Sequence, residues 1–145
     1  MKNESIFIDT EAFFHKKQEL LKLSEMEYQL ITNNVVIYEF IDVISYELEI
    51  AKNNHNERRI EILTNLRERF PKLIIDLGIV IKDFTLTNEI LLTIYQLMDI
   101  YKMSIGDIFH LLTIKEHTIK YILSNDEDWK RTENLVKIFD IKDNN

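Results

Sequence analysis

The 145-residue chain is predicted to fold as an α/β protein, with helices on both faces of a mostly parallel central sheet. Three observations predict this class. Short apolar runs typical of buried strands alternate with longer segments that have a helical period. Only two glycines and one proline punctuate the chain, which favours long helices and short connections. Apolar residues make up 46% of the chain, enough for one substantial core, so we expect residues 1–145 to form a single domain.

The first third of the chain predicts one strand, one helix and a short second element. Residues 5–8, Ser-Ile-Phe-Ile, are short and apolar, as expected of a strand buried in a parallel sheet. A helix is expected over residues 11–23 and a short element near residues 27–31. The polar run Thr-Asn-Asn at residues 32–34 then predicts the start of a long helix that reaches about Lys52.

The middle of the chain predicts two helices around a strand. After a polar break at residues 53–56, a helix is expected from Glu57 towards Phe70, and Pro71 should end or kink it. Residues 79–84 begin with the β-branched run Ile-Val-Ile and predict a strand. Apolar residues recur at helical spacing from residue 86 to residue 101, which predicts the next helix.

The last third of the chain repeats the alternation. Ser104 is expected to cap a helix, and residues 121–123 predict a strand. A short helix should follow Asp126, and residues 135–139 predict a last strand. This alternation of strands with helical segments is the order that a parallel sheet requires.

Four acidic residues lie just beyond an apolar run or on the helix that follows one. Asp9 follows the first strand, Glu39 lies on the long helix, Asp107 follows Ser104, and Asp126 follows the strand at residues 121–123. Because ligand-binding loops of parallel sheets gather at the carboxyl ends of the strands, these carboxylates are expected to converge. Converging carboxylates repel one another unless a cation neutralises them, and such hard oxygen ligands suit Mg²⁺ or Mn²⁺.

Each acid taken alone also has a purely structural interpretation. Asp9, or Thr10 beside it, could cap the following helix, and Asp107 fits a capping-box-like helix start. The segment around Asp126 could be a polar turn before a helix. Glu39 stands at helical spacing from three residues whose exposed stripe it could share: Asp42, Tyr46 and Glu49.

The order of these motifs resembles that of the PIN-domain ribonucleases, from about Ile6 to Ile138. Residues 124–129, Ser-Asn-Asp-Glu-Asp-Trp, resemble the PIN pattern Thr-x-Asp-x-Asp-Phe, with two conservative replacements. Residues 104–107, Ser-Ile-Gly-Asp, supply the third acid, and Gly106 allows close approach of backbone or substrate. Ile108 departs from the pattern, because a small residue often follows the third acid. The chain looks like the small PIN proteins that serve as toxins in VapBC-type toxin–antitoxin pairs.

The resemblance implies a PIN-like three-layer α/β/α fold and an endoribonuclease that depends on Mg²⁺ or Mn²⁺. The catalytic and metal-binding residues it implies are Asp9, Glu39, Asp107 and Asp126. It assigns an auxiliary role to Thr10, Ser124 and Asp128. One or two bound ions would activate water for hydrolysis of an RNA phosphodiester bond. The resemblance further implies a cognate antitoxin protein as partner, and a homodimer.

The composition limits the alternatives. No apolar stretch approaches the ~20 residues of a membrane helix, and no signal peptide is recognised, so we expect a cytoplasmic protein with no membrane partner. The net charge of −7 argues against a broad phosphate-binding surface. This acidity mildly favours the alternative of a PIN-like binding module without turnover. An RNA-processing nuclease without an antitoxin stays open as a second alternative. No zinc-like spacing is found among His15, His55, His110 and His117.

Overall fold

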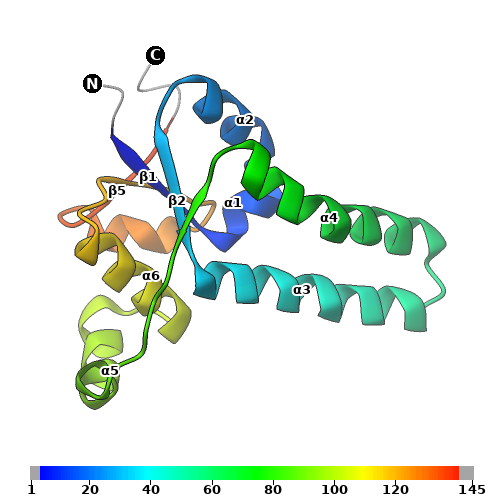
Figure 1. Cartoon of the computed structure of the whole chain (residues 1–145). Coiled ribbons are helices and arrows are strands. Elements are labelled where there is room, and N and C mark those ends of the chain that lie inside the picture. The colour runs from blue at the N-terminus through cyan, green and yellow to red at the C-terminus, as the bar shows by residue number, and fades with distance from the viewer. Residues whose placement is uncertain (1–3, 141–145) are drawn as a thin grey trace.

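The computed structural model describes residues 4–140, in which five strands form an all-parallel sheet of order β3-β2-β1-β4-β5 (Figure 1). The strands are β1 (Ser5–Ile8), β2 (Gln29–Asn33), β3 (Val80–Lys82), β4 (Tyr121–Leu123) and β5 (Lys137–Ile138). β1 is central, and its Phe7 pairs with Ile31 of β2 on one side and Ile122 of β4 on the other. Helices cover both faces, so the predicted three-layer α/β/α class is confirmed.

The helices begin largely where the sequence predicts. They are α1 (Thr10–His15), α2 (Lys17–Glu25), α3 (Asn34–Asn53), α4 (Glu57–Asp76), α5 (Asn88–Tyr101), α6 (Ile105–Glu116) and the 3₁₀ helix η1 (Glu127–Thr132). A side-chain oxygen accepts a first-turn backbone N–H at the start of each of the four long helices, from Asn33, Asn56, Thr87 and Ser104. These caps satisfy N–H groups that have no partner within the helix. None of the helices described between residues 4 and 140 combines the length and apolarity needed to cross a bilayer.

Two predicted boundaries in the helices are wrong. The single helix expected over residues 11–23 is divided, because Lys16 (φ −122°, ψ 28°) leaves the helical region and separates α1 from α2. α4 continues through Pro71 to Asp76, so the proline does not end it. Phe70 and Ile74 on either side of the proline are buried in the core. Their packing outweighs the backbone hydrogen bond that the proline removes.

The strands are also displaced from the predicted spans. The short element expected near residues 27–31 is β2, and it begins at Gln29, where the chain first pairs with Ser5 of β1. The strand expected over residues 79–84 is confined to β3, and the strand expected over residues 135–139 to β5. Both are edge strands that pair on one side, which leaves their ends without ladder partners.

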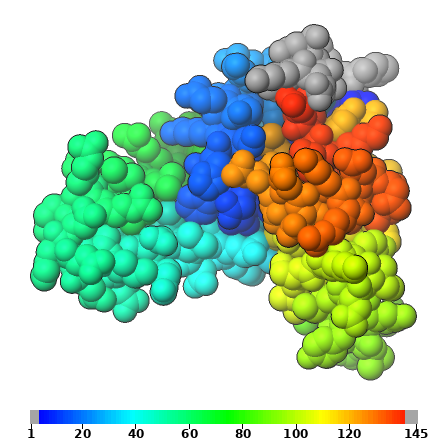
Figure 2. Space-filling view, turned by 180° about the vertical axis from the view of Figure 1, so that it is seen from behind, coloured from blue at the N-terminus to red at the C-terminus, as the bar shows by residue number. Residues whose placement is uncertain are grey.

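α3 and α4 form a long hairpin that projects from the sheet, and α5 forms a second projection (Figures 1 and 2). An aromatic cluster joins the base of the hairpin to α1. Phe40 of α3 stacks on Phe70 of α4 with ring centroids 3.7 Å apart, and Phe13 of α1 meets Phe70 edge-on at 5.2 Å. This packing sets the position of α1 relative to α3, the helices that carry Thr10 and Glu39.

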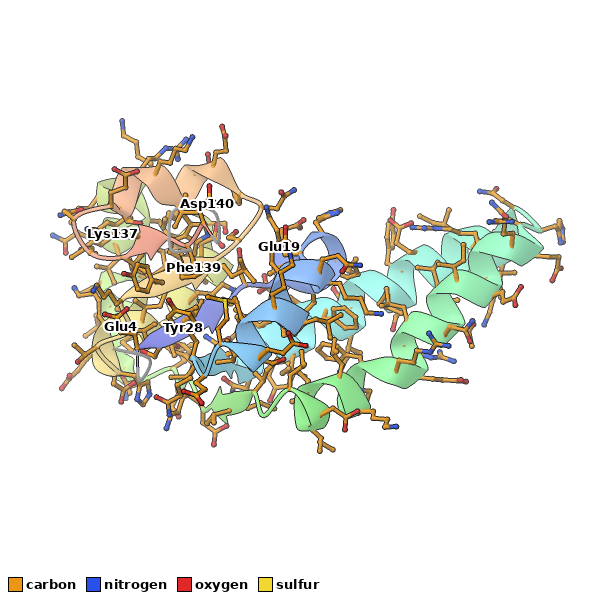
Figure 3. The ribbon with its side chains drawn as sticks, turned by 90° about the horizontal axis from the view of Figure 1, so that it is seen from above. Glu4, Glu19, Tyr28, Lys137, Phe139 and Asp140 are labelled. Atoms are coloured by element: carbon orange, nitrogen blue, oxygen red, sulfur yellow. The ribbon has the colours of Figure 1, made fainter. Side chains whose placement is uncertain are left out.

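Aromatic side chains pack against one another at the amino ends of β2 and β4. Tyr28, just before β2, and Tyr121, at the start of β4, lie edge-on to Phe139 with centroids 5.3 and 5.4 Å away (Figure 3). Nearby, Lys120 Nζ lies 2.9 Å from Glu4 Oε1. Polar side chains with buried contacts to one another gather instead at the carboxyl ends of the strands.

Candidate acidic site at the carboxyl edge of the sheet

The direction of chain progression reverses between β1 and β4. The chain moves outward from β1 through β2 to β3, and then continues on the other side of β1 with β4 and β5. Parallel sheets bind ligands beyond the carboxyl ends of strands at such a switch point. Asp9 directly follows β1 and Ser124 directly follows β4, and the Asp9 N–H donates to the Leu123 carbonyl at 3.1 Å.

Asp9 is buried, with 4% of its surface exposed. Its Oδ1 accepts the Thr10 N–H at 2.8 Å, which agrees with the helix-cap interpretation. Its Oδ2 accepts the Ser124 hydroxyl at 2.7 Å, and the Ser124 Oγ in turn accepts the Asp126 N–H at 3.0 Å. Ser124 therefore links the first acid to the fourth across the two central strands, so the cap and the acidic site share one side chain.

Glu39 turns away from the exposed stripe that its spacing suggested. Its Oε1 accepts the Thr10 hydroxyl at 2.9 Å and lies 2.7 Å from His110 Nε2, while its side chain is 39% exposed. Burial raises the pKa of Glu39, but the hydrogen bond and electrostatic attraction to His110, together with the hydrogen bond from Thr10, hold the pKa below its ordinary value of 4.5. Glu39 is therefore ionised at neutral pH. The other residues of the stripe are exposed: Asp42, Tyr46 and Glu49.

Asp107 lies in the first turn of α6, where its N–H donates to the Ser104 Oγ at 3.4 Å. Burial, then the negative charges of Asp9, Asp126 and Glu39, raise its pKa from 3.8 to about 6, against an opposing effect of His110. The Asp107 carboxyl group therefore interacts electrostatically with all three of the other acids. Such repulsion is expected where carboxylates gather without a neutralising cation.

Gly106 allows the close approach that its lack of a side chain suggested. A Cβ added at this position would lie 2.8 Å from Glu39 Oε2, which is closer than real Cβ atoms approach a neighbour. The absence of a side chain at Gly106 therefore leaves room for the Glu39 carboxylate beside α6.

Asp126 and Asp128 take different roles. Asp126 Oδ1 accepts the Asp128 N–H at 2.9 Å and caps η1. The Asp128 carboxylate is exposed and lies 3.1 Å from Arg131. Asp128 therefore contacts the acidic site through its backbone, whereas its side chain pairs with a surface cation.

His110 is the residue that the sequence analysis missed. It lies on α6 one turn after Asp107, is fully buried, and places Nε2 2.7 Å from Glu39 Oε1 and 3.8 Å from Asp9 Oδ1. A search for zinc-like spacing among histidines could not find it, because its neighbours are carboxylates. The available signal was the three-residue spacing from Asp107 on one helix, which puts both side chains on the same face.

The donor chemistry of this edge fits a hard divalent cation. One candidate ligand atom from each of Asp9, Asp107 and His110 lies within 4.8 Å of the other two. Carboxylate oxygens are the ligands that Mg²⁺ and Mn²⁺ prefer. A cation here would also relieve the repulsion that raises the pKa of Asp107.

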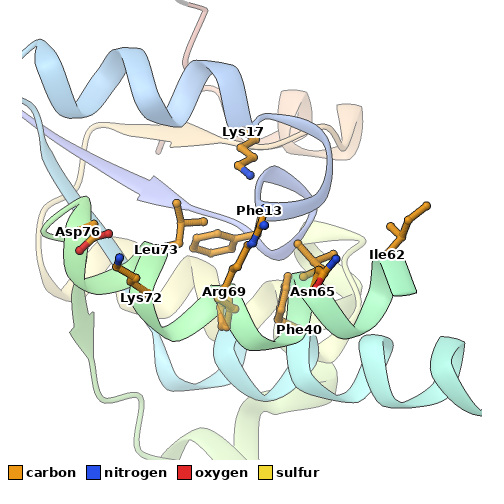
Figure 4. Close-up of a pocket in the computed structure, with 11 residues that line it drawn as sticks. Phe13, Lys17, Phe40, Ile62, Asn65, Arg69, Lys72, Leu73 and Asp76 are labelled. Carbon is orange, nitrogen blue, oxygen red and sulfur yellow. The ribbon is translucent and has the colours of Figure 1, made fainter. Parts of the chain in front are cut away.

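A pocket of about 540 Å³ lies between α4 and the α1–α2 region, where Phe13, Phe40 and Phe70 line it together with Lys17 and Arg69 (Figure 4). None of the four acids lines this pocket. The apolar pocket and the acidic site are therefore separate features of the described chain.

Comparison with known proteins agrees with the motif order. A family model described as PIN domain matches residues 6–135. Among solved structures, PAE2754 from Pyrobaculum aerophilum is similar, with a TM-score of 0.54 and 10% identity over 95% of this chain and 85% of that one. The crystal structure of VapBC2 from Rickettsia felis bound to a DNA fragment from its promoter is also similar. Its TM-score is 0.57, with 13% identity over 92% of this chain and 96% of that one. No match was found among curated proteins. The resemblance deduced from the four acidic motifs is thus confirmed, and the chain belongs to the PIN domain family.

Proposed function

We propose that this protein is a metal-dependent endoribonuclease whose catalytic and metal-binding residues are Asp9, Glu39, Asp107 and Asp126. The observation that carries the proposal is the gathering of the four acids at one edge of the sheet. Ser124 joins Asp9 to the Asp126 backbone, Asp107 has a candidate ligand atom within 4.8 Å of one on Asp9, and Thr10 and His110 hold Glu39 beside them. Membership of the PIN family, whose members are generally nucleases, supports the reaction class.

The hydrogen bonds of each acidic side chain indicate the role that we propose for it. Both oxygens of Asp9 are held by hydrogen bonds, so this carboxylate is a fixed ligand at the centre of the site. Among the hydrogen bonds within residues 4–140, the Asp107 carboxylate takes part in none, which leaves both of its oxygens available. Mg²⁺ or Mn²⁺ bound here would supply charge neutralisation and lower the pKa of water. Ionised Glu39, or Asp126, would orient the attacking water and accept its proton.

We also propose that the protein is the toxin of a type II toxin–antitoxin pair, with an antitoxin protein as partner. Support comes from the motif order and the similarity in fold to VapBC2. An antitoxin would inhibit the site by placing a basic side chain among the acids. Exposed apolar side chains on α3 and α5 support a homodimer: Tyr38, Ile41, Leu91, Leu92 and Tyr95.

The direct test is cleavage of single-stranded RNA with Mg²⁺ or Mn²⁺, with EDTA, and with the variant Asp9→Asn. We expect cleavage by the wild type with metal and none with EDTA or with the variant. Asp42→Asn, an exposed acid one turn from Glu39, is the matched control and should cleave as the wild type does. Cleavage that persists in EDTA would exclude the metal mechanism.

Two further results separate the alternatives. Protein that binds Mn²⁺ by calorimetry and captures a protein partner, yet cleaves no RNA, would favour the binding module without turnover. A small antitoxin gene next to this one would distinguish the toxin from an RNA-processing nuclease that has no antitoxin.

A further inference from the structure

A chain of buried polar side chains runs from the end of β2 to Glu39. Asn33 caps α3 through its Oδ1, which accepts the Val36 N–H at 2.9 Å. Its Nδ2 lies 2.9 Å from Thr113 Oγ1 and 3.2 Å from His110 Nδ1. Asn33 and His110 are fully buried and Thr113 is 1% exposed, so water does not compete for these hydrogen bonds.

The cap determines which way the Asn33 amide faces. A backbone N–H can only donate, so the Asn33 atom opposite Val36 is the carbonyl oxygen, and the NH₂ group points to the other side. The Thr113 hydroxyl donates its proton to the Phe109 carbonyl at 3.0 Å. Its oxygen therefore accepts a hydrogen bond from one of the two N–H groups of the Asn33 amide. The second N–H is directed at His110 Nδ1.

This arrangement selects one tautomer of His110. A buried N–H needs an acceptor, so Nδ1 must present its lone pair to Asn33, and the ring proton lies on Nε2. The Nε2–H then donates to Glu39 Oε1 at 2.7 Å. A ring in this state has no lone pair left on Nε2 to offer to a cation.

We propose that His110 is a positioning residue, held by Asn33 as the Nε2–H tautomer so that it orients Glu39 and does not ligate the cation. The inference rests on the proposed nuclease function and deepens it. Ligation by His110 Nε2 would move its proton to Nδ1, where it would face the Asn33 N–H at a distance of 3.2 Å between the two nitrogens. Relief of that contact would require the amide to flip and α3 to lose its cap.

His110 helps to position the two carboxylate oxygens of Glu39. Oε1 is held by two donors from different helices, the Thr10 hydroxyl and His110 Nε2. Oε2 is the oxygen next to Gly106, where a Cβ would lie 2.8 Å away. Fixing Oε1 thus determines where Oε2 stands at the edge of the acidic site, and small misplacements of such a group are costly in catalysis.

Nuclear magnetic resonance of ¹⁵N-histidine-labelled protein tests the tautomer without any assay of activity. Long-range ¹H–¹⁵N correlations distinguish Nε2–H, Nδ1–H and imidazolium rings, and the signals that disappear in His110→Gln identify His110. We expect the Nε2–H pattern at pH 7.5, with a slowly exchanging ring proton, both without and with saturating Mg²⁺. An Nδ1–H ring, an imidazolium, or a change of tautomer when Mg²⁺ is added would overturn the proposal, whether or not the protein cleaves RNA.

Two variants test the positioning role. His110→Leu removes the donor, and kcat should fall about 10- to 100-fold with a smaller change in KM for RNA. In His110→Gln the amide can accept from Asn33 and donate to Glu39, so it should recover most of that loss. A His110→Gln protein that is folded, yet as impaired in kcat as His110→Leu, would contradict the proposal. The control is His117→Gln, at the C-terminal cap of the same helix and outside the acidic site.

Discussion

The raised pKa of Asp107 predicts that Asp107→Asn stabilises the metal-free protein. Its pKa is about 6 in the folded protein against an ordinary value of 3.8, so the folded state binds more protons than the unfolded state between these values. Stability is therefore lost as the pH rises from about 4 to about 6, and the loss is complete above the folded pKa. An asparagine resembles the neutral carboxyl group and does not undergo this loss.

The pKa difference of Asp107 gives the size of the expected stabilisation of Asp107→Asn. At about 1.4 kcal/mol for each factor of ten in the ionisation constant, the difference between 3.8 and about 6 is worth about 3 kcal/mol at pH 7.5. The side chain is partly exposed, and solvent screening reduces this value. The variant also loses a negative charge in the first turn of α6, which costs roughly 0.3–1 kcal/mol. We therefore expect a net gain in the free energy of unfolding of about 1–2 kcal/mol.

Urea unfolding in EDTA measures this gain at a series of pH values between 4 and 7.5. Trp129, the single tryptophan, is fully buried and reports the transition by fluorescence. At pH 7.5 the melting temperature should also rise, by roughly 2–8 °C for a domain of this size. The advantage of the variant should shrink as the pH falls below 6 and disappear near 4.

Two outcomes would refute the reasoning. The first is a variant that is less stable than the wild type at pH 7.5 in chelator, and the second is a gain that does not change with pH. Asp99→Asn on α5 is the control, because this acid is exposed and its removal should leave stability nearly unchanged. Mn²⁺ should raise the melting temperature of the wild type more than that of Asp107→Asn.

Three further predictions concern the site, the core and assembly. Gly106→Ala should lower the rate of RNA cleavage at least tenfold, because its Cβ would displace Glu39, whereas better helix propensity should keep its melting temperature unchanged or higher. Phe70→Ala should cost about 3–5 kcal/mol in urea unfolding, since Phe70 joins α4 to α1 and α3; a cost below 1 kcal/mol would show that the cluster is not needed. Light scattering should give a mass near twice 17.4 kDa if the exposed apolar surface of α3 and α5 forms a dimer, and a mass near 17.4 kDa would exclude that dimer.

Local patterns in the sequence are sufficient to predict the order of the strands and helices along the chain and the starts of the long helices. Hydrophobic periodicity, apolar runs and capping residues act over a few positions. They therefore predict β1, β4, the cap at Ser104 and the start of α3 within the polar run at residues 32–34 without knowledge of the fold. The order of the four acids along the chain was also sufficient to identify the family. Each motif is local, and the topology of the sheet sets the order in which the motifs occur along the chain.

The contacts of each acid depend on tertiary packing and could not be predicted from the sequence. Asn33 and His110 are 77 positions apart, and no local pattern predicts that an asparagine cap also faces a histidine ring. The turn of Glu39 toward Thr10 and His110, rather than along its exposed stripe, depends on how α3 packs beside α1 and α6. Charge repulsion at Asp107 likewise arises only when four segments meet at one edge of the sheet, because electrostatic interactions act through space and not along the chain.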